Sequence, residues 1–227
     1  MIFKQLFDTK SSTCTYLIAS AKGREAIIID PVLENVDEYI HHLKELDLKL
    51  VKVIDTHIHA DHITGASKLK INTNCTTIMG ENSPAETVDV KLEDGGIIEI
   101  DQLKIKAMFT PGHTSDSYSF LMDKYLFSGD TLLINGTGRT DFQNGSSEDA
   151  YHSLFNKLLK LPEETILYPG HDYNGKQFST IGKEKKNNPR LQVESVDEYI
   201  EIMSNLNLSK PKMIDENISR NLKLGNV

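Results

Sequence analysis

The sequence predicts a single α/β domain, and two observations lead to this prediction. Short runs rich in β-branched and aromatic residues alternate along the chain with stretches whose apolar residues recur at helical spacing. The chain has 227 residues, of which 38% are hydrophobic and 26% charged, enough to bury one sizeable core. We therefore expect one domain over residues 1–227, with helices packed on a sheet.

The first half of the chain contains the strands and helices typical of this class. Residues 26–31 are expected to form a strand that is buried on both faces and ends in a proline turn. Residues 35–47 follow as an amphipathic helix, because their apolar residues recur at three- and four-residue steps. Next come a strand at 50–55, a helix at 65–70 and a strand at 76–80.

The second half predicts two hairpins and a further strand and helix. Alternating polarity and short polar turns indicate hairpins over 97–108 and 118–128. A helix is expected over 148–160 and a strand over 165–168. Residues 191–227 predict one packing helix and a tail, both part of the same domain.

Charge and cysteine content exclude several classes of function. The formal net charge of −8 argues against binding to a phosphate backbone, and the short basic stretch 183–186 is interpreted as a solvated turn. Two cysteines, Cys14 and Cys75, make no disulfide framework and are expected to be small buried residues. The N-terminal segment has no basic start before a long apolar run, and no run approaches about 20 apolar residues, so we expect a cytoplasmic protein.

Side chains of the kinds that bind metals follow four of the expected strands. Imidazoles and carboxylates are the groups that hold divalent transition metals, and loops at the ends of several strands can converge on one ion. The sequence therefore predicts a metal centre. The candidate residues are His57, His59, Asp61, His62, His113, Asp130, His171 and Asp172.

Other polar residues near these loops are expected to have supporting roles. Asp55 and Thr56 are expected to support the first loop rather than to react. The remaining histidines, His41, His42 and His152, fall on expected helices and are interpreted as helix-surface residues.

Residues 57–62, His-Ile-His-Ala-Asp-His, match the HxHxDH signature of the metallo-β-lactamase superfamily. His113, Asp130 and His171 match its three later ligand positions, so the chain resembles this superfamily over nearly its whole length. The resemblance implies an αββα sandwich with the metal in a cleft at one edge. Phrases such as TPGHT at 110–114 and YPGHDY at 168–173 are most similar to the persulfide dioxygenases, the ethylmalonic encephalopathy protein-like group.

The resemblance to persulfide dioxygenases implies oxidation of glutathione persulfide by O₂ and water to sulfite and glutathione. It also implies one Fe(II) per chain, held by His57, His113 and Asp130 with coordination positions left open. In the hydrolytic relatives, the other candidates of the cluster complete a two-metal site. In the dioxygenases the same residues orient ligands through hydrogen bonds. These residues are His59, Asp61, His62 and His171, with Asp172 bracing a loop.

Arg139 and Tyr173 are the candidates for binding the thiol carrier. Glutathione has two carboxylates, and a guanidinium can bind a carboxylate through a bidentate pair of hydrogen bonds. Tyr173 matches a tyrosine that contacts glutathione in the relatives. The alternative for both residues is a structural ion pair or a hydroxyl bonded in the core. The resemblance also implies a homodimer.

Two alternatives to an iron dioxygenase remain open. One is a glyoxalase II-type hydroxyacylglutathione hydrolase with a binuclear zinc or iron site. Against it, only about forty residues follow Arg190, where glyoxalase II continues into a helical domain. The other is a non-catalytic sulfur-carrier or metal-binding module. In either sulfur-handling case, a sulfurtransferase partner is expected to be a separate protein.

Overall fold

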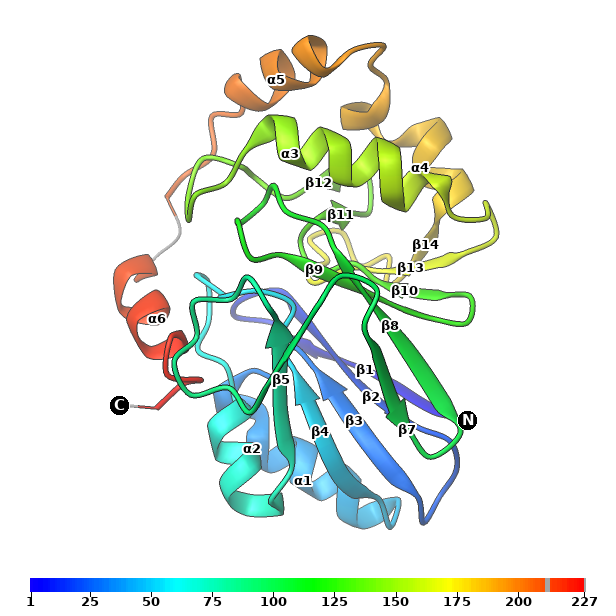
Figure 1. The fold of residues 1–227 in the computed structure, drawn as a ribbon, viewed down its shortest axis with the longest axis vertical. Coiled ribbons are helices and arrows are strands. Elements are labelled where there is room, and N and C mark those ends of the chain that lie inside the picture. The colour runs from blue at the N-terminus through cyan, green and yellow to red at the C-terminus, as the bar shows by residue number, and fades with distance from the viewer. Residues whose placement is uncertain (211–212, 227) are drawn as a thin grey trace.

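The computed structural model describes residues 1–210 and 213–226. Two six-stranded sheets pack face to face, with helices on the outer side of each (Figure 1). The αββα sandwich expected from the sequence is confirmed.

The first sheet has the order β1-β2-β3-β4-β5-β6. Its strands pair antiparallel from β1 to β3 and parallel from β3 to β6. Helices α1 (Val36–Glu45) and α2 (Ala66–Thr73) cover its outer face. The strands are β1 (Ile2–Asp8), β2 (Thr13–Ala19), β3 (Glu25–Ile29), β4 (Lys49–Ile54), β5 (Thr76–Gly80) and β6 (Val90–Leu92).

The second sheet has the order β14-β13-β10-β9-β8-β7. The two expected hairpins, β7–β8 and β9–β10, are both present as antiparallel pairs. A short hairpin of β11 (Leu132–Leu133) and β12 (Gly136–Thr137) stands beside this sheet. The strands of the sheet are β7 (Ile97–Ile100), β8 (Leu103–Phe109), β9 (Tyr118–Met122), β10 (Tyr125–Phe127), β13 (Ile166–Tyr168) and β14 (Ser179–Thr180).

Helices also cover the outer face of the second sheet. The expected helix at 148–160 is continuous but changes its pitch twice, from α3 (Ser147–His152) to a π-helical turn (Ser153–Lys157) and a 3₁₀ turn (Leu158–Lys160). The basic stretch 183–186 lies in helix α4 (Ile181–Asn187), so its interpretation as a turn was wrong.

The alternating direction of side chains along the central strands explains why both faces of each sheet are buried. In β3, Ala26 and Ile28 pack toward α1 and α2, whereas Ile27 and Ile29 face the second sheet. Successive side chains of a strand point to opposite faces, so an unbroken apolar run fills two layers at once. The prediction of a strand buried on both faces is confirmed.

The C-terminal region contains two helices where one was expected. Helix α5 (Val196–Ser204) packs against α3 and the β11–β12 hairpin, because the ring of Tyr199 lies 6.0 Å from that of Tyr151 and its hydroxyl bonds to that of Thr137 at 3.0 Å. Helix α6 (Ile214–Asn221) lies beside the first sheet instead (Figure 1). The prediction of a single helix and a tail was therefore wrong. None of the helices in the described part of the chain is long and apolar enough to cross a membrane.

The candidate metal ligands lie where four strands end. His57 follows β4 of the first sheet, while His113, Asp130 and His171 follow β8, β10 and β13 of the second. Because β10 and β13 run parallel, their two loops leave the sheet at the same edge. Hydrogen bonds join the sheets here, from the Cys14 N–H to the Gly170 carbonyl and from the Tyr118 N–H to the Thr56 carbonyl.

Candidate metal centre

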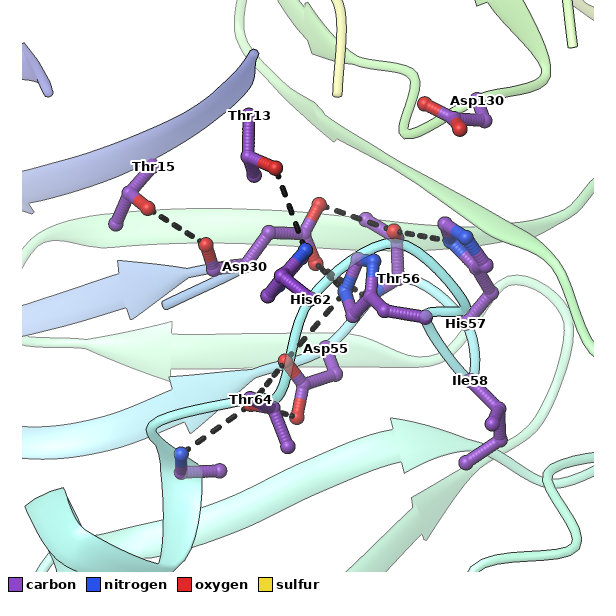
Figure 2. Close-up of polar contacts among 12 residues, drawn as sticks. Thr13, Thr15, Asp30, Asp55, Thr56, His57, Ile58, His62, Thr64 and Asp130 are labelled. Carbon is purple, nitrogen blue, oxygen red and sulfur yellow. Dashed lines mark hydrogen bonds and ion pairs between the residues drawn. The ribbon is translucent and has the colours of Figure 1, made fainter. Parts of the chain in front are cut away.

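The histidine loop, residues 55–64, joins β4 to α2 and is fixed by two buried carboxylates. Asp30 accepts hydrogen bonds from the N–H of Thr56 at 2.7 Å and from its hydroxyl at 3.0 Å. Asp55 accepts a hydrogen bond from the hydroxyl of Thr64 at 2.8 Å. Figure 2 shows both carboxylates pointing into the loop. The loop is therefore tied near both of its ends, and the supporting role expected of Asp55 and Thr56 is confirmed.

Three of the candidate residues converge on one point. His57, His113 and Asp130 each offer a ligand atom, and these atoms lie within 4.8 Å of one another. The rings of His57 and His113 are nearly perpendicular, with centroids 4.9 Å apart. Nε2 of His113 lies 3.5 Å from Oδ2 of Asp130. A single divalent ion fits among three donor atoms at this spacing.

Hydrogen bonds leave a free nitrogen on each histidine of this group. Nδ1 of His113 lies 2.7 Å from the carbonyl oxygen of Arg139, which can only accept, so Nδ1 carries the proton and Nε2 keeps its lone pair. Nδ1 of His57 bonds to the hydroxyl of Thr56 at 2.9 Å. Burial and the neighbouring His59 and His113 hold the pKa of His57 well below its usual value. A neutral imidazole is the form that binds a metal.

A second group lies beside the first. His59, Asp61 and His62 also offer ligand atoms within 4.8 Å of one another. Within the described residues, Nδ1 of His59 and Nε2 of His62 are buried and have no hydrogen-bond partner. Buried nitrogens without a partner are unusual, and a metal ion or a bound molecule would satisfy them. The chemistry of these donors therefore fits a metal site.

The remaining nitrogen of His59 faces the supporting carboxylates. Its Nε2 lies 3.2 Å from Oδ1 of Asp30 and 3.7 Å from Oδ1 of Asp55. The ligand atoms of Asp30, Asp55 and His59 also lie within 4.8 Å of one another. Because both carboxylates already accept hydrogen bonds from the threonines of the loop, we assign them to holding the ring. With Nε2 held in this way, Nδ1 is the nitrogen of His59 that has no partner among the described residues.

His171 connects the two groups. Its Nδ1 lies 2.7 Å from Oδ1 of Asp130, and its Nε2 lies 2.9 Å from Oδ2 of Asp61. Asp61 also pairs with Nδ1 of His62 at 2.9 Å. Although burial opposes ionisation, the nearby His171, His113 and His57 hold the pKa of Asp130 below its usual value. Asp130 is therefore a carboxylate, as a metal ligand must be.

A cleft of about 700 Å³ opens from these groups. His113, Asp130 and His171 line it, and so do residues of the β11–β12 hairpin. Arg139, Tyr173 and Arg190 line the same cleft. The cleft thus joins the candidate metal ligands to the side chains that could bind a substrate.

Arg139 lines the cleft but is already engaged. Its Nε and Nη2 donate to the two oxygens of Asp141 at 2.6 and 2.7 Å. Its Nη1 donates to the carbonyl of Ser209 at 2.7 Å. The ring of Tyr173 stacks on His171 with centroids 5.6 Å apart, and 67% of the residue is exposed. Arg139 thus makes a structural ion pair, whereas Tyr173 is open to the cleft.

Arg190 is a cleft residue that the sequence did not single out. It is half-buried, and its Nη1 donates to the carbonyl of Thr137. No carboxylate lies within ion-pair distance of it in the described parts of the chain. Burial lowers the pKa of this guanidinium. The available signal was the Asn-Pro-Arg-Leu phrase at 188–191, which resembles the family but does not reveal an unpaired charge.

The other candidates have structural surroundings. Asp172 is buried and accepts hydrogen bonds from the backbone N–H groups of Asn174 at 2.9 Å and Gln177 at 2.8 Å, so it braces the loop after β13. Cys14 and Cys75 are buried in the two cores, as expected. The histidines expected on helices are found there and outside the metal-type groups: His41 and His42 on α1, and His152 on α3.

Comparison with known protein families identifies the fold and its cluster. A model described as the Metallo-beta-lactamase superfamily matches residues 9–171, which include both three-residue groups and His171. The chain belongs to this superfamily. The region matched therefore carries every candidate ligand that the strand ends bring together.

Several relatives are similar over most of the chain. The chain is 40% identical to proteins named persulfide dioxygenase ETHE1, mitochondrial, from Homo sapiens and Bos taurus, over 99% of this chain and 89% of each relative. It is 47% identical to a crystal structure of ETHE1 from Myxococcus xanthus, with a TM-score of 0.97 over the whole of both chains. A hydroxyacylglutathione hydrolase from Dictyostelium discoideum is 34% identical over 76% of this chain and 68% of its own. The resemblance to persulfide dioxygenases is therefore confirmed.

Proposed function

We propose that the protein is a persulfide dioxygenase that oxidises glutathione persulfide with O₂ and water to sulfite and glutathione. The observation that carries this proposal is the similarity to persulfide dioxygenases over 99% of the chain, together with the group His57, His113 and Asp130, of which His113 and Asp130 line the cleft. In this reaction four electrons pass from the outer sulfur to O₂, and the inner sulfur leaves as the thiol. The substrate carrier and the iron are parts of the proposal.

His57, His113 and Asp130 would hold one Fe(II). Two imidazoles and one carboxylate form the set that leaves coordination positions open for O₂ and a second ligand. When bound, ferrous iron supplies electrons and brings O₂ next to the sulfur anion. The chain contributes the preset nitrogens, because Thr56 and the carbonyl of Arg139 turn Nε2 of each ring toward the ion.

His171 would act on Asp130 rather than as a ligand. It occupies Oδ1 of Asp130, while Oδ2 faces His113, so the carboxylate presents one oxygen to the ion. Its other nitrogen is occupied by Asp61. This arrangement supports one metal ion at the first group, with His59, Asp61, His62 and His171 orienting ligands around it.

Arg190 would bind a carboxylate of the thiol carrier. It is a cation of the cleft with no carboxylate partner in the described residues, and glutathione offers two carboxylates. A guanidinium holds a carboxylate through two parallel hydrogen bonds. Arg139 would instead keep the wall of the cleft in place, because Asp141 and Ser209 use its donors. Tyr173, exposed beside His171, would contact the carrier near the sulfur.

The test is an oxygen-uptake assay on protein loaded anaerobically with Fe(II). With glutathione persulfide we expect one O₂ consumed for each sulfite formed, and negligible hydrolysis of S-lactoylglutathione by the same sample. Rapid thioester hydrolysis without oxygen uptake would reverse the proposal.

A second candidate function is the hydrolysis of glutathione thioesters. The second group, His59, Asp61 and His62, favours it because two of its nitrogens are buried, have no hydrogen-bond partner in the part of the chain that the structure describes, and could hold a second ion. The similarity to the Dictyostelium discoideum hydrolase supports it as well. The S-lactoylglutathione arm of the assay tests this candidate directly.

A further inference from the structure

The C-terminal helix α6 contacts the histidine loop through two buried amide side chains. Asn221 is 1% exposed, and its Nδ2 donates to the carbonyl oxygens of His59 and His62, both at 2.8 Å. Its Oδ1 accepts from the N–H of Thr64 at 2.9 Å. Asn217 adds one more bond, from its Nδ2 to the carbonyl of Ala60 at 2.9 Å.

The side-chain amide of Asn221 bonds to the loop both as a donor and as an acceptor. A primary amide has two N–H donors and a carbonyl acceptor, and here the loop uses both donors and the acceptor. Residues 59–62 belong to no helix or strand, so their carbonyls need partners from elsewhere in the fold. Asn221 supplies partners for two of them at once. Aspartate could not donate, and an apolar residue could neither donate nor accept.

The hydrophobic cluster between the first sheet and helices α1 and α2 fixes the position of α6 independently of the loop. Leu224, just after the helix, is buried in the same cluster as Ile58, Leu69 and the strands of the first sheet. Its carbonyl accepts from the N–H of Ser67 at 3.1 Å, and that of Leu222 accepts from Glu86 at 2.8 Å. The helix is therefore anchored to the sheet, and the amide of Asn221 projects from a rigid support.

The side chains that Asn221 controls are those with buried free nitrogens. Asn221 holds the carbonyls of His59 and His62, and these residues carry the two buried ring nitrogens that have no partner among residues 1–210 and 213–226. Asp61 lies between them in the sequence. Fixing the carbonyls at both ends of this four-residue segment fixes the direction in which its side chains leave the backbone. The contact is therefore made on the part of the loop that faces the metal site.

We propose that Asn221 is a positioning residue that sets the geometry of the metal site by holding the backbone of residues 59–64. The proposal requires a metal ion in the cluster formed by His57, His113 and Asp130 with the adjoining His59, Asp61 and His62. It does not depend on whether persulfide or a thioester is the substrate. Its failure is therefore distinguishable from failure of the proposed function. A residue that only anchored the C-terminus would stabilise the fold without affecting the bound metal.

The experiment compares Asn221→Ala with Asn226→Ala in the full-length protein loaded with Co(II). Asn226 is a matched control on the same C-terminal segment, because its amide donates to the hydroxyl of Ser67 at 2.8 Å and not to the loop. For Asn221→Ala we expect an altered visible absorption spectrum of Co(II) and about tenfold to hundredfold weaker metal binding, as for other residues that orient ligands. Asn226→Ala should match the unmodified protein in both.

A wild-type spectrum and wild-type Co(II) affinity in folded Asn221→Ala would overturn the proposal. Hydrogen exchange of the unmodified protein tests the same contact without a variant. The N–H of Thr64 should exchange as slowly as that of Ile28 in the core strand β3, because Asn221 holds it away from water. Exchange of the Thr64 amide at the rate of an open loop would also overturn the proposal.

Discussion

Nδ1 of His171 lies 2.7 Å from Oδ1 of Asp130, so an imidazole occupies one oxygen of the carboxylate that faces His57 and His113. Burial alone would lower the pKa of His171, but the carboxylates of Asp130 and Asp61 raise it well above its usual value. Both ring nitrogens of His171 are thus engaged by carboxylates, those of Asp130 and Asp61. His113 and His171 therefore differ in role although both lie beside Asp130.

This difference predicts contrasting effects of two substitutions on iron binding. His113→Ala removes one of three ligands, and we expect the purified variant to retain almost no iron after gel filtration. His171→Ala removes a residue that orients Asp130, and one iron per chain should remain, bound about tenfold to hundredfold more weakly. Metal analysis of both variants after the same anaerobic loading makes the measurement. Equal loss of iron from the two proteins would contradict the one-ion assignment.

Arg190→Ala should weaken substrate binding and leave the iron in place. The loss of a charge-assisted pair costs about 1.5–3 kcal/mol, so the KM for glutathione persulfide should rise about tenfold to hundredfold. Steady-state oxygen uptake over a range of substrate concentrations checks this. Arg24→Ala is the matched control, because Arg24 pairs with Asp101 away from the cleft. An unchanged KM in Arg190→Ala would show that the carboxylate binds elsewhere.

Gly112→Ala should destabilise the loop that carries His113. Gly112 has φ of +138°, and a Cβ there would lie 2.3 Å from the Cα of Ala150 in α3. Backbone strain and overpacking each cost about 1–3 kcal/mol, so we expect a loss of about 2–6 kcal/mol in the free energy of unfolding. Urea denaturation measures it. Gly136→Ala is the control, because no atom lies within 4 Å of its added Cβ.

The sequence predicted the central strands and the metal-type residues because their signals are local. The isoleucine run of β3 and the spacing of His57, His59 and His62 can be read from neighbouring residues alone. Helix α6 was missed because its buried face includes Asn217 and Asn221, polar residues whose partners lie more than 150 positions earlier in the chain.

The roles of the two cleft arginines could not be predicted for the same reason. Arg139 follows Asp130 closely in the sequence, and its guanidinium could hold a carboxylate of glutathione. Asp141, two residues later, takes its Nε and Nη2, and its Nη1 is taken by the carbonyl of Ser209, which the fold brings back from seventy positions later. Arg190 is unpaired because the fold places no carboxylate beside it among the described residues. Such pairing is a property of the tertiary structure, and motif spacing does not encode it.

Metal titration should show saturation at one ion per chain. A ligand that binds only the folded protein stabilises it by about 4 kcal/mol at a thousand times its dissociation constant, so Fe(II) should raise the Tm of metal-free protein. If His57, His113 and Asp130 form the only tight site, the rise in Tm should end at one equivalent, since His171 and Asp61 occupy each other. Calorimetry under anaerobic conditions records this end point. A second rise that ends at two equivalents, and is lost in His62→Ala, would place a second ion at His59, Asp61 and His62 and would favour hydrolysis over oxidation.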